Sequence, residues 1–247
     1  MNSKTGIFFH SDWRKTSLES SDPIESSHPM MRRMSVLQKV VSLALLSFKA
    51  KHEDFWREYI LSDLCRIYYA SVYGEIDIMS KLSRQIIEED FPISPRDFQN
   101  SVHNAAPAYA SMLTGFTRGM LVGSSGFLSA DKTLYLASTR IQHGLEPMAL
   151  LIHAHGVKQS SGVEEAQAEM LLLGDESFSN ESLPKLGAIA NLELISEESE
   201  LAGFAQCASV YQSEEETPLA WLSASFNQRG LRISKNLSGF GVRSEWI

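Results

Sequence analysis

The chain has 247 residues, of which 43% are apolar and 21% charged, a composition that is ordinary for one large globular domain or two small ones. The net charge is −8 and no Lys/Arg-rich run occurs, which argues against binding to the nucleic-acid backbone. The two cysteines, Cys65 and Cys207, lie far apart, so the sequence predicts neither a disulfide framework nor a cysteine zinc site, and a reducing cytoplasm is expected.

The N-terminal part predicts an extended arm followed by the start of a domain. Residues 1–30 are rich in serine and contain two prolines, and within them only residues 6–10 predict a strand. Residues 1–17 carry polar and charged side chains where a signal peptide would need a continuous apolar segment, so no export signal is expected. Residues 36–50 are largely apolar but interrupted by polar side chains, and they are shorter than the roughly 20 residues that span a bilayer. They predict a core helix, and no membrane insertion is expected.

The middle of the chain alternates between strand-like and helix-like segments. The predicted strands are residues 65–72, 119–124, 147–156 and 168–174, and the predicted helices are residues 76–89, 103–115 and 129–143. The helix at 103–115 is built mainly of small residues, a composition typical of close packing. This alternation favours an α/β or α+β fold with a mixed sheet.

Charge is unevenly distributed along the chain. Residues 160–220 contain 13 acidic residues and one basic residue, so this window carries −12 and the remainder of the chain +4. A solvated acidic surface is the ordinary interpretation of such a window.

Three segments in order resemble the β-ketoacyl synthases of the thiolase fold. They are HPMMRRMS at 28–35, ASVYGEI at 70–76 and SPRDFQNSVHNAAPAYASMLTG at 94–115. The resemblance is to the short chain length factors of aryl polyene and type II polyketide clusters, and it extends over residues 28–175. It implies a thiolase-like layered α/β fold with a mixed sheet and a shortened C-terminal half. A single domain is then expected over residues 31–247, with 31–175 corresponding to the N-terminal half of a ketosynthase.

The resemblance also implies that the chain lacks ketosynthase chemistry. In active members an Asn begins the small-residue helix, a Gly closes it eleven residues later, and the nucleophilic Cys follows twelve residues further on. Asn104 and Gly115 keep the first spacing, and the second falls on Phe127, which cannot attack a thioester. The family's two catalytic histidines are missing as well, because residues 176–247 contain no His and His155 comes too early. No catalytic residue, cofactor or metal is therefore expected, and His103 is interpreted as a structural hydrogen-bond donor at the helix start.

In this family the strand before the nucleophile position pairs across a two-fold axis, so the expected partner is a complete, catalytic β-ketoacyl synthase. The dimer-interface candidates are Gly119, Met120, Leu121, Val122, Gly123 and Ser124. The candidates for the closed end of the partner's acyl channel are Met79, Leu82, Ile86 and Phe98, for which an ordinary core position is the alternative. Acyl carrier protein is expected to dock mainly on the synthase, because carrier proteins are acidic like residues 160–220.

Other interpretations stay open from the sequence. Ser125 or Ser129 would be the nucleophile if the chain were itself an acyl-transfer or decarboxylating enzyme, although no G-x-S-x-G motif is present. A purely structural subunit of a synthase and a homodimeric scaffold are further alternatives. His153 and His155 share one strand face, as metal ligands would, but an ordinary polar strand face is favoured.

Overall fold

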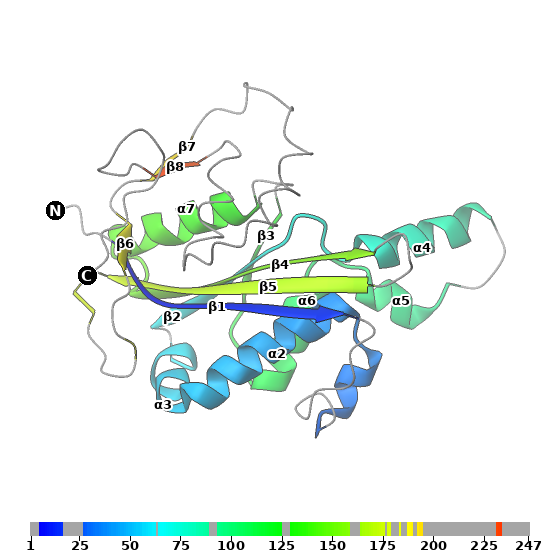
Figure 1. Ribbon diagram of the computed structural model, residues 1–247, viewed down its shortest axis with the longest axis horizontal. Helices are drawn as coiled ribbons and strands as arrows, with labels where there is room; N and C mark the ends of the chain where they lie inside the picture. The colour runs from blue at the N-terminus through cyan, green and yellow to red at the C-terminus, as the bar shows by residue number, and fades with distance from the viewer. Residues whose placement is uncertain are drawn as a thin grey trace.

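A six-stranded mixed sheet forms the centre of the computed structural model, in the order β3-β2-β4-β5-β1-β6 (Figure 1). The structure describes residues 5–16, 27–62, 64–88, 93–124, 129–158, 164–175, 177–178, 183, 187–189, 192–194 and 231–233. The strands of the sheet are β1 (Thr5–Thr16), β2 (Cys65–Ala70), β3 (Leu121–Gly123), β4 (Met148–Lys158), β5 (Glu164–Asp175) and β6 (Gly187–Ile189). A separate pair consists of β7 (Leu192–Leu194) and β8 (Leu231–Ile233).

The sheet is parallel on one side and antiparallel on the other. β2 runs parallel to both β3 and β4, whereas β5 is antiparallel to β4 and to β1, and β6 is antiparallel to β1. The predicted mixed sheet is thus confirmed. Each of the strands predicted between residues 65 and 174 is present, with boundaries that differ by a few residues.

Helices cover both faces of this sheet. They are η1 (Pro29–Arg33), α2 (Val36–Lys51), α3 (Glu53–Phe55), the π-helix η2 (Trp56–Ile60), α4 (Ile76–Ile87), α5 (Pro95–Asn100), α6 (Ala105–Thr114) and α7 (Ser129–Gln142). α2 and α6 pack on one face and α7 on the other (Figure 1). α2 starts at a capping box in which Ser35 and Gln38 bond reciprocally, and ten of its sixteen residues are buried, as predicted for a core helix. α4 and α5 extend sideways beyond the sheet (Figure 1).

Within the predicted arm over residues 1–30, the strand expected at residues 6–10 is confirmed, but it is longer than predicted and extends over residues 5–16. These residues form β1, which lies between β5 and β6 and pairs with β5 from Thr5 opposite Asp175 to Thr16 opposite Glu165. Phe9 packs edge-on against Phe48 of α2, with ring centroids 4.8 Å apart. The strand is held by hydrogen bonds and ring contacts to residues far away in sequence, which local composition does not reveal.

Within the described parts of the chain, none of the helices combines the length and the apolar character that crossing a membrane requires.

Candidate functional site at the sheet edge

β3 is the outermost strand of the sheet and is partly exposed. It pairs with β2 through Tyr68 opposite Leu121 and Ala70 opposite Gly123, and the sheet order places no further strand beyond it among the described residues. Leu121 and Val122 are 42% and 38% exposed. Open strand edges are sites where another chain can add a strand. Leu121, Val122 and Gly123 of the dimer-interface candidates therefore form the outermost strand of the sheet among the described residues, and Gly119, Met120 and Ser124 flank it.

The position of β3 is fixed by close contact with α7. A Cβ atom added to Gly123 would lie 2.5 Å from Oγ1 of Thr133, on α7. Any larger residue at this position would therefore force the Thr133 side chain to move. β3 and α7, the helix that follows the nucleophile position, are therefore in close contact.

His103, Asn104 and Gly115 come from the segment that resembles the ketosynthases. His103 and Asn104 lie near the ends of β2 and β3. Asn104 is the N-cap residue of α6 and Gly115 its C-cap, with the left-handed φ of 73° that favours glycine. His103 is half-buried and lies so close to Gly74 that a Cβ there would overlap Nδ1 of the imidazole. Burial lowers the pKa of His103, while contacts with the backbone of Gly123 and Ser71 act in the opposite direction. The structure thus places His103 between these strand ends.

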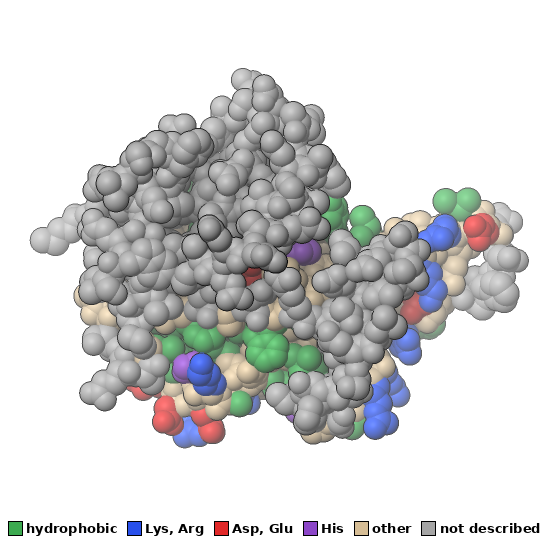
Figure 2. Space-filling model, in the orientation of Figure 1, with side chains coloured by type: hydrophobic (Ala, Val, Ile, Leu, Met, Phe, Trp, Pro, Cys, Tyr) green, Lys and Arg blue, Asp and Glu red, His purple; other side chains and the backbone are tan. Residues whose placement is uncertain are grey.

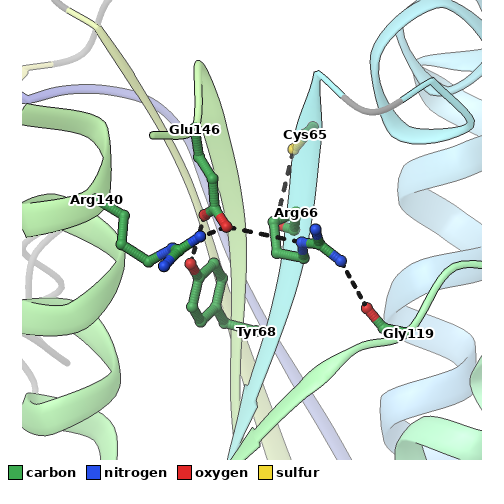
Figure 3. A network of polar contacts seen from close by, with 6 residues as sticks. All are labelled: Cys65, Arg66, Tyr68, Gly119, Arg140 and Glu146. Atoms are coloured by element: carbon green, nitrogen blue, oxygen red, sulfur yellow. Dashed lines mark hydrogen bonds and ion pairs between the residues drawn. The ribbon is translucent and has the colours of Figure 1, made fainter. Parts of the chain in front are cut away.

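A polar cluster around Glu146 connects α7, β2 and the segment before β3 (Figure 3). The Tyr68 hydroxyl donates to the Glu146 carboxylate, and Nε of Arg140 donates to it at 2.9 Å. Nε of Arg66 lies 3.7 Å from the same carboxylate, and its guanidinium reaches the Gly119 carbonyl oxygen at 3.5 Å. Burial and the Glu146 carboxylate raise the pKa of Tyr68. Nothing in the spacing of these residues predicts the cluster, because their elements meet only in the fold.

The four acyl-channel candidates differ in how much of each side chain is exposed. Leu82 is buried, with 6% of its surface exposed, whereas Met79, Ile86 and Phe98 are 51%, 59% and 63% exposed. The alternative of an ordinary core position therefore holds for Leu82 and is wrong for the other three. An ion pair between Lys81 and Asp97, at 2.5 Å, joins α4 to α5.

A pocket of about 590 Å³ lies between α4, α5 and the start of α2. Its lining is rich in charged side chains, which come from α4, from α5 and from the end of η1 just before α2. They are Arg33, Asp77, Lys81, Arg84, Glu88, Arg96 and Asp97. A charged lining of this kind does not suit an acyl chain.

The structure describes only some of the residues considered as nucleophiles. Ser125 and Phe127 lie outside the described residues. Ser129 opens α7 and is buried, with 1% of its surface exposed. Cys65 is buried too, and burial raises the pKa of its thiol, which disfavours the reactive thiolate.

The two histidines of β4 lie side by side, with ring centroids 5.8 Å apart. Burial, and secondarily the charge of His155, lower the pKa of His153 to about 3. Among the residues whose positions are described, no three His, Cys, Asp or Glu side chains come together as metal ligands would.

The mixed sheet with its helical layers has the thiolase-like fold. The family model for the N-terminal domain of β-ketoacyl synthases matches residues 11–158, and the chain belongs to this family. The match includes the second half of β1, so it begins well before residue 28, where the resemblance seen in the sequence began.

Solved structures with the same fold include ketosynthase complexes. A chain of the ketosynthase ApeO in complex with its chain length factor ApeC, from Xenorhabdus doucetiae, is 19% identical, with a TM-score of 0.53 and 79% of this chain and 84% of that chain covered. A chain of the ishigamide ketosynthase/chain length factor is 14% identical, with a TM-score of 0.56 and coverage of 77% and 56%. A β-ketoacyl synthase from Burkholderia phymatum STM815 is 10% identical, with a TM-score of 0.62 and coverage of 84% and 68%.

Identities this low establish the fold alone. The chain is similar in length to the matched chain of the ApeO–ApeC complex, since the covered shares are nearly equal, whereas it spans little more than half of the matched ishigamide chain. None of the curated proteins compared with the chain matches it.

Proposed function

We propose that the chain is a non-catalytic chain length factor, which forms a heterodimer with an active β-ketoacyl synthase in type II polyketide or aryl polyene biosynthesis. Membership of the ketosynthase family supports this proposal. So does the similarity to chains of two ketosynthase/chain length factor complexes, one of which has a similar length.

The observation that carries the proposal is the residue at the nucleophile position. Asn104 and Gly115 cap α6 at its two ends, in agreement with the first family spacing, and the second spacing is counted from Gly115 without a gap. The spacing leads to Phe127, between β3 and α7, and a phenyl ring cannot attack a thioester. A serine enzyme is a weaker alternative, because Ser129 is buried at the start of α7.

The proposed mechanism is steric. Each two-carbon extension pushes the tethered chain deeper into the synthase, until it meets side chains that reach across the interface. Met79, Ile86 and Phe98 suit this role because they face outward. Leu82, the fourth candidate, is buried inside the chain and would act by holding α4 in position.

The carrier protein is proposed to dock on the synthase rather than on this chain. Residues 160–220 carry −12, and acyl carrier proteins are acidic, so like charges oppose docking there. Cytoplasmic localisation is part of the same proposal.

Reconstitution with carrier-bound substrates tests the function. The synthase is assayed with the wild-type chain and with Met79→Ala, Leu82→Ala, Ile86→Ala and Phe98→Ala variants, and product lengths are compared. Removal of the phenyl ring in Phe98→Ala enlarges the space across the interface, so longer products are expected. An unchanged distribution in all four variants would favour a purely structural subunit. Labelling of the isolated chain by acyl or malonyl substrates that disappears in Ser125→Ala would favour an enzyme.

A further inference from the structure

The charged pocket beside α4 contains arginine side chains that no described acid neutralises. Its volume of about 590 Å³ lies in the range that small-molecule sites usually have. Arg33, Arg84 and Arg96 line it, and none of the three forms an ion pair with another described residue. Lys81, the fourth cation, differs because Asp97 pairs with it. Three guanidinium groups are therefore available to an anion.

Hydrogen bonds and an ion pair connect the elements that carry these arginines. Asn100 of α5 donates from Nδ2 to the Arg33 carbonyl oxygen at 3.2 Å. The Ser35 hydroxyl, at the start of α2, donates at 3.1 Å to the carboxylate of Glu75, the N-cap residue of α4. Lys81 in turn joins α4 to α5 through its ion pair. The backbone around the pocket is thus held in place before a ligand arrives, which lowers the entropy cost of binding.

Two acidic side chains also line the pocket, at the two ends of the charged row on α4. Asp77 and Glu88 are separated by about 16 Å along the helix axis, and Lys81 and Arg84 lie between them. Neither carboxylate forms an ion pair with another described residue. The middle of the row is therefore cationic, whereas hydrogen-bond acceptors lie at its ends.

The charged row lies on the face of α4 opposite to the acyl-channel candidates of this helix. Lys81 follows Met79 by two residues and Arg84 precedes Ile86 by two, so each pair is about 200° apart around the helix. Figure 2 shows Lys and Arg side chains on the part of the surface that α4 and α5 form. A ligand in the pocket therefore leaves the outward face of α4 uncovered, and its binding is independent of the proposed function.

We propose that this pocket binds a small phosphate ester through Arg33, Arg84 and Arg96. Guanidinium groups form paired, charge-assisted hydrogen bonds with phosphate oxygens. A phosphate group carries a charge of about −1.5 to −2 at pH 7 and has three terminal oxygens that point in different directions, so it bonds arginines from three elements at once. A carboxylate, with two oxygens in one plane and a single charge, matches this arrangement less well. Hydroxyl groups of the ester donate to Asp77 and Glu88 at the ends of the row.

Titration calorimetry of the full chain with glycerol 3-phosphate tests the proposal. Binding is expected for this ester and not for glycerol, and it weakens as salt is added. Arg33→Gln, Arg84→Gln and Arg96→Gln each raise the dissociation constant at least about 10-fold, because each removes charge-assisted hydrogen bonds. Arg32→Gln is the matched control, since Arg32 is exposed and lies next to Arg33 but does not line the pocket, and it changes the constant less than about 3-fold.

All four arginines are exposed, so the variants are expected to keep the thermal stability of the wild type, which a melting curve checks. If the wild-type chain binds neither glycerol 3-phosphate nor inorganic phosphate, or binds glycerol as tightly as the ester, the proposal is wrong. Equal weakening in Arg32→Gln would also overturn it, because the effect would then come from net charge rather than from the pocket. Inorganic phosphate that binds as tightly as the ester would refute the role of the hydroxyl groups. None of these results bears on the proposed function, which is tested with the synthase.

Discussion

Replacement of Gly74 by alanine tests how tightly the turn after β2 is built. Gly74 has a φ of +56°, a left-handed conformation that costs other residues about 1–2 kcal/mol. The new Cβ would also overlap Nδ1 of His103 and lie 3.0 Å from Cε1, and overpacking of this kind costs about 1–3 kcal/mol more. Gly74→Ala is therefore expected to lower the free energy of unfolding by about 2–5 kcal/mol.

Gly144 supplies the matched control. Its φ is +68°, but an added Cβ meets nothing within 4 Å, so Gly144→Ala lowers the free energy of unfolding by the backbone cost of about 1–2 kcal/mol alone. Urea denaturation of both variants, and of Gly74→Ala combined with His103→Ala, measures the difference. The double variant should recover most of the overpacking cost, because the imidazole is gone. Equal losses for Gly74→Ala and Gly144→Ala, or a coupling energy below about 0.5 kcal/mol, would refute the argument.

Three further predictions concern buried ionisable groups. The pKa of His153 is about 3 in the folded chain and 6.5 in the unfolded chain, so only the unfolded state binds the proton between these values. Stability to urea should be constant above pH 6.5 and fall below it by about 1.4 kcal/mol per pH unit, less steeply in His153→Leu. Glu146→Ala leaves the buried Tyr68 hydroxyl without its acceptor and should cost roughly 1–3 kcal/mol, with a smaller loss for Glu146→Gln, whose amide oxygen still accepts. In a Cys207→Ser background the Cys65 thiol should react with a disulfide reagent only on unfolding, since it is buried with a raised pKa; rapid reaction of the folded chain would contradict this.

The elements that local patterns predicted are those with a long run of apolar side chains, most of which are buried. The helical spacing of residues 36–50 predicted α2, and the β-branched and aromatic run at 65–72 predicted β2. The length of β1 was underestimated because its pairing partner, β5, lies far along the chain: Thr16 pairs with Glu165, 149 residues on, and Thr5 with Asp175, 170 residues on.

The candidate site was predictable in part. The strand before the nucleophile position was located from the family spacing, and the structure places β3 at the edge of the sheet. The direction in which Met79 and Ile86 face was not predictable, because an apolar stripe on a helix has the same pattern whether it packs on its own core or on a partner. The Glu146 cluster was missed because no motif joins its members.

The most direct test of the central proposal is the composition of the complex formed on co-expression with a ketosynthase that has an intact catalytic cysteine. Size-exclusion chromatography with native mass measurement gives both stoichiometry and mass. A single species with one copy of each chain is expected, in which acyl substrates label the synthase and not this chain. A stable homodimer of this chain that excludes the synthase, or acylation of this chain within the complex, would contradict the account.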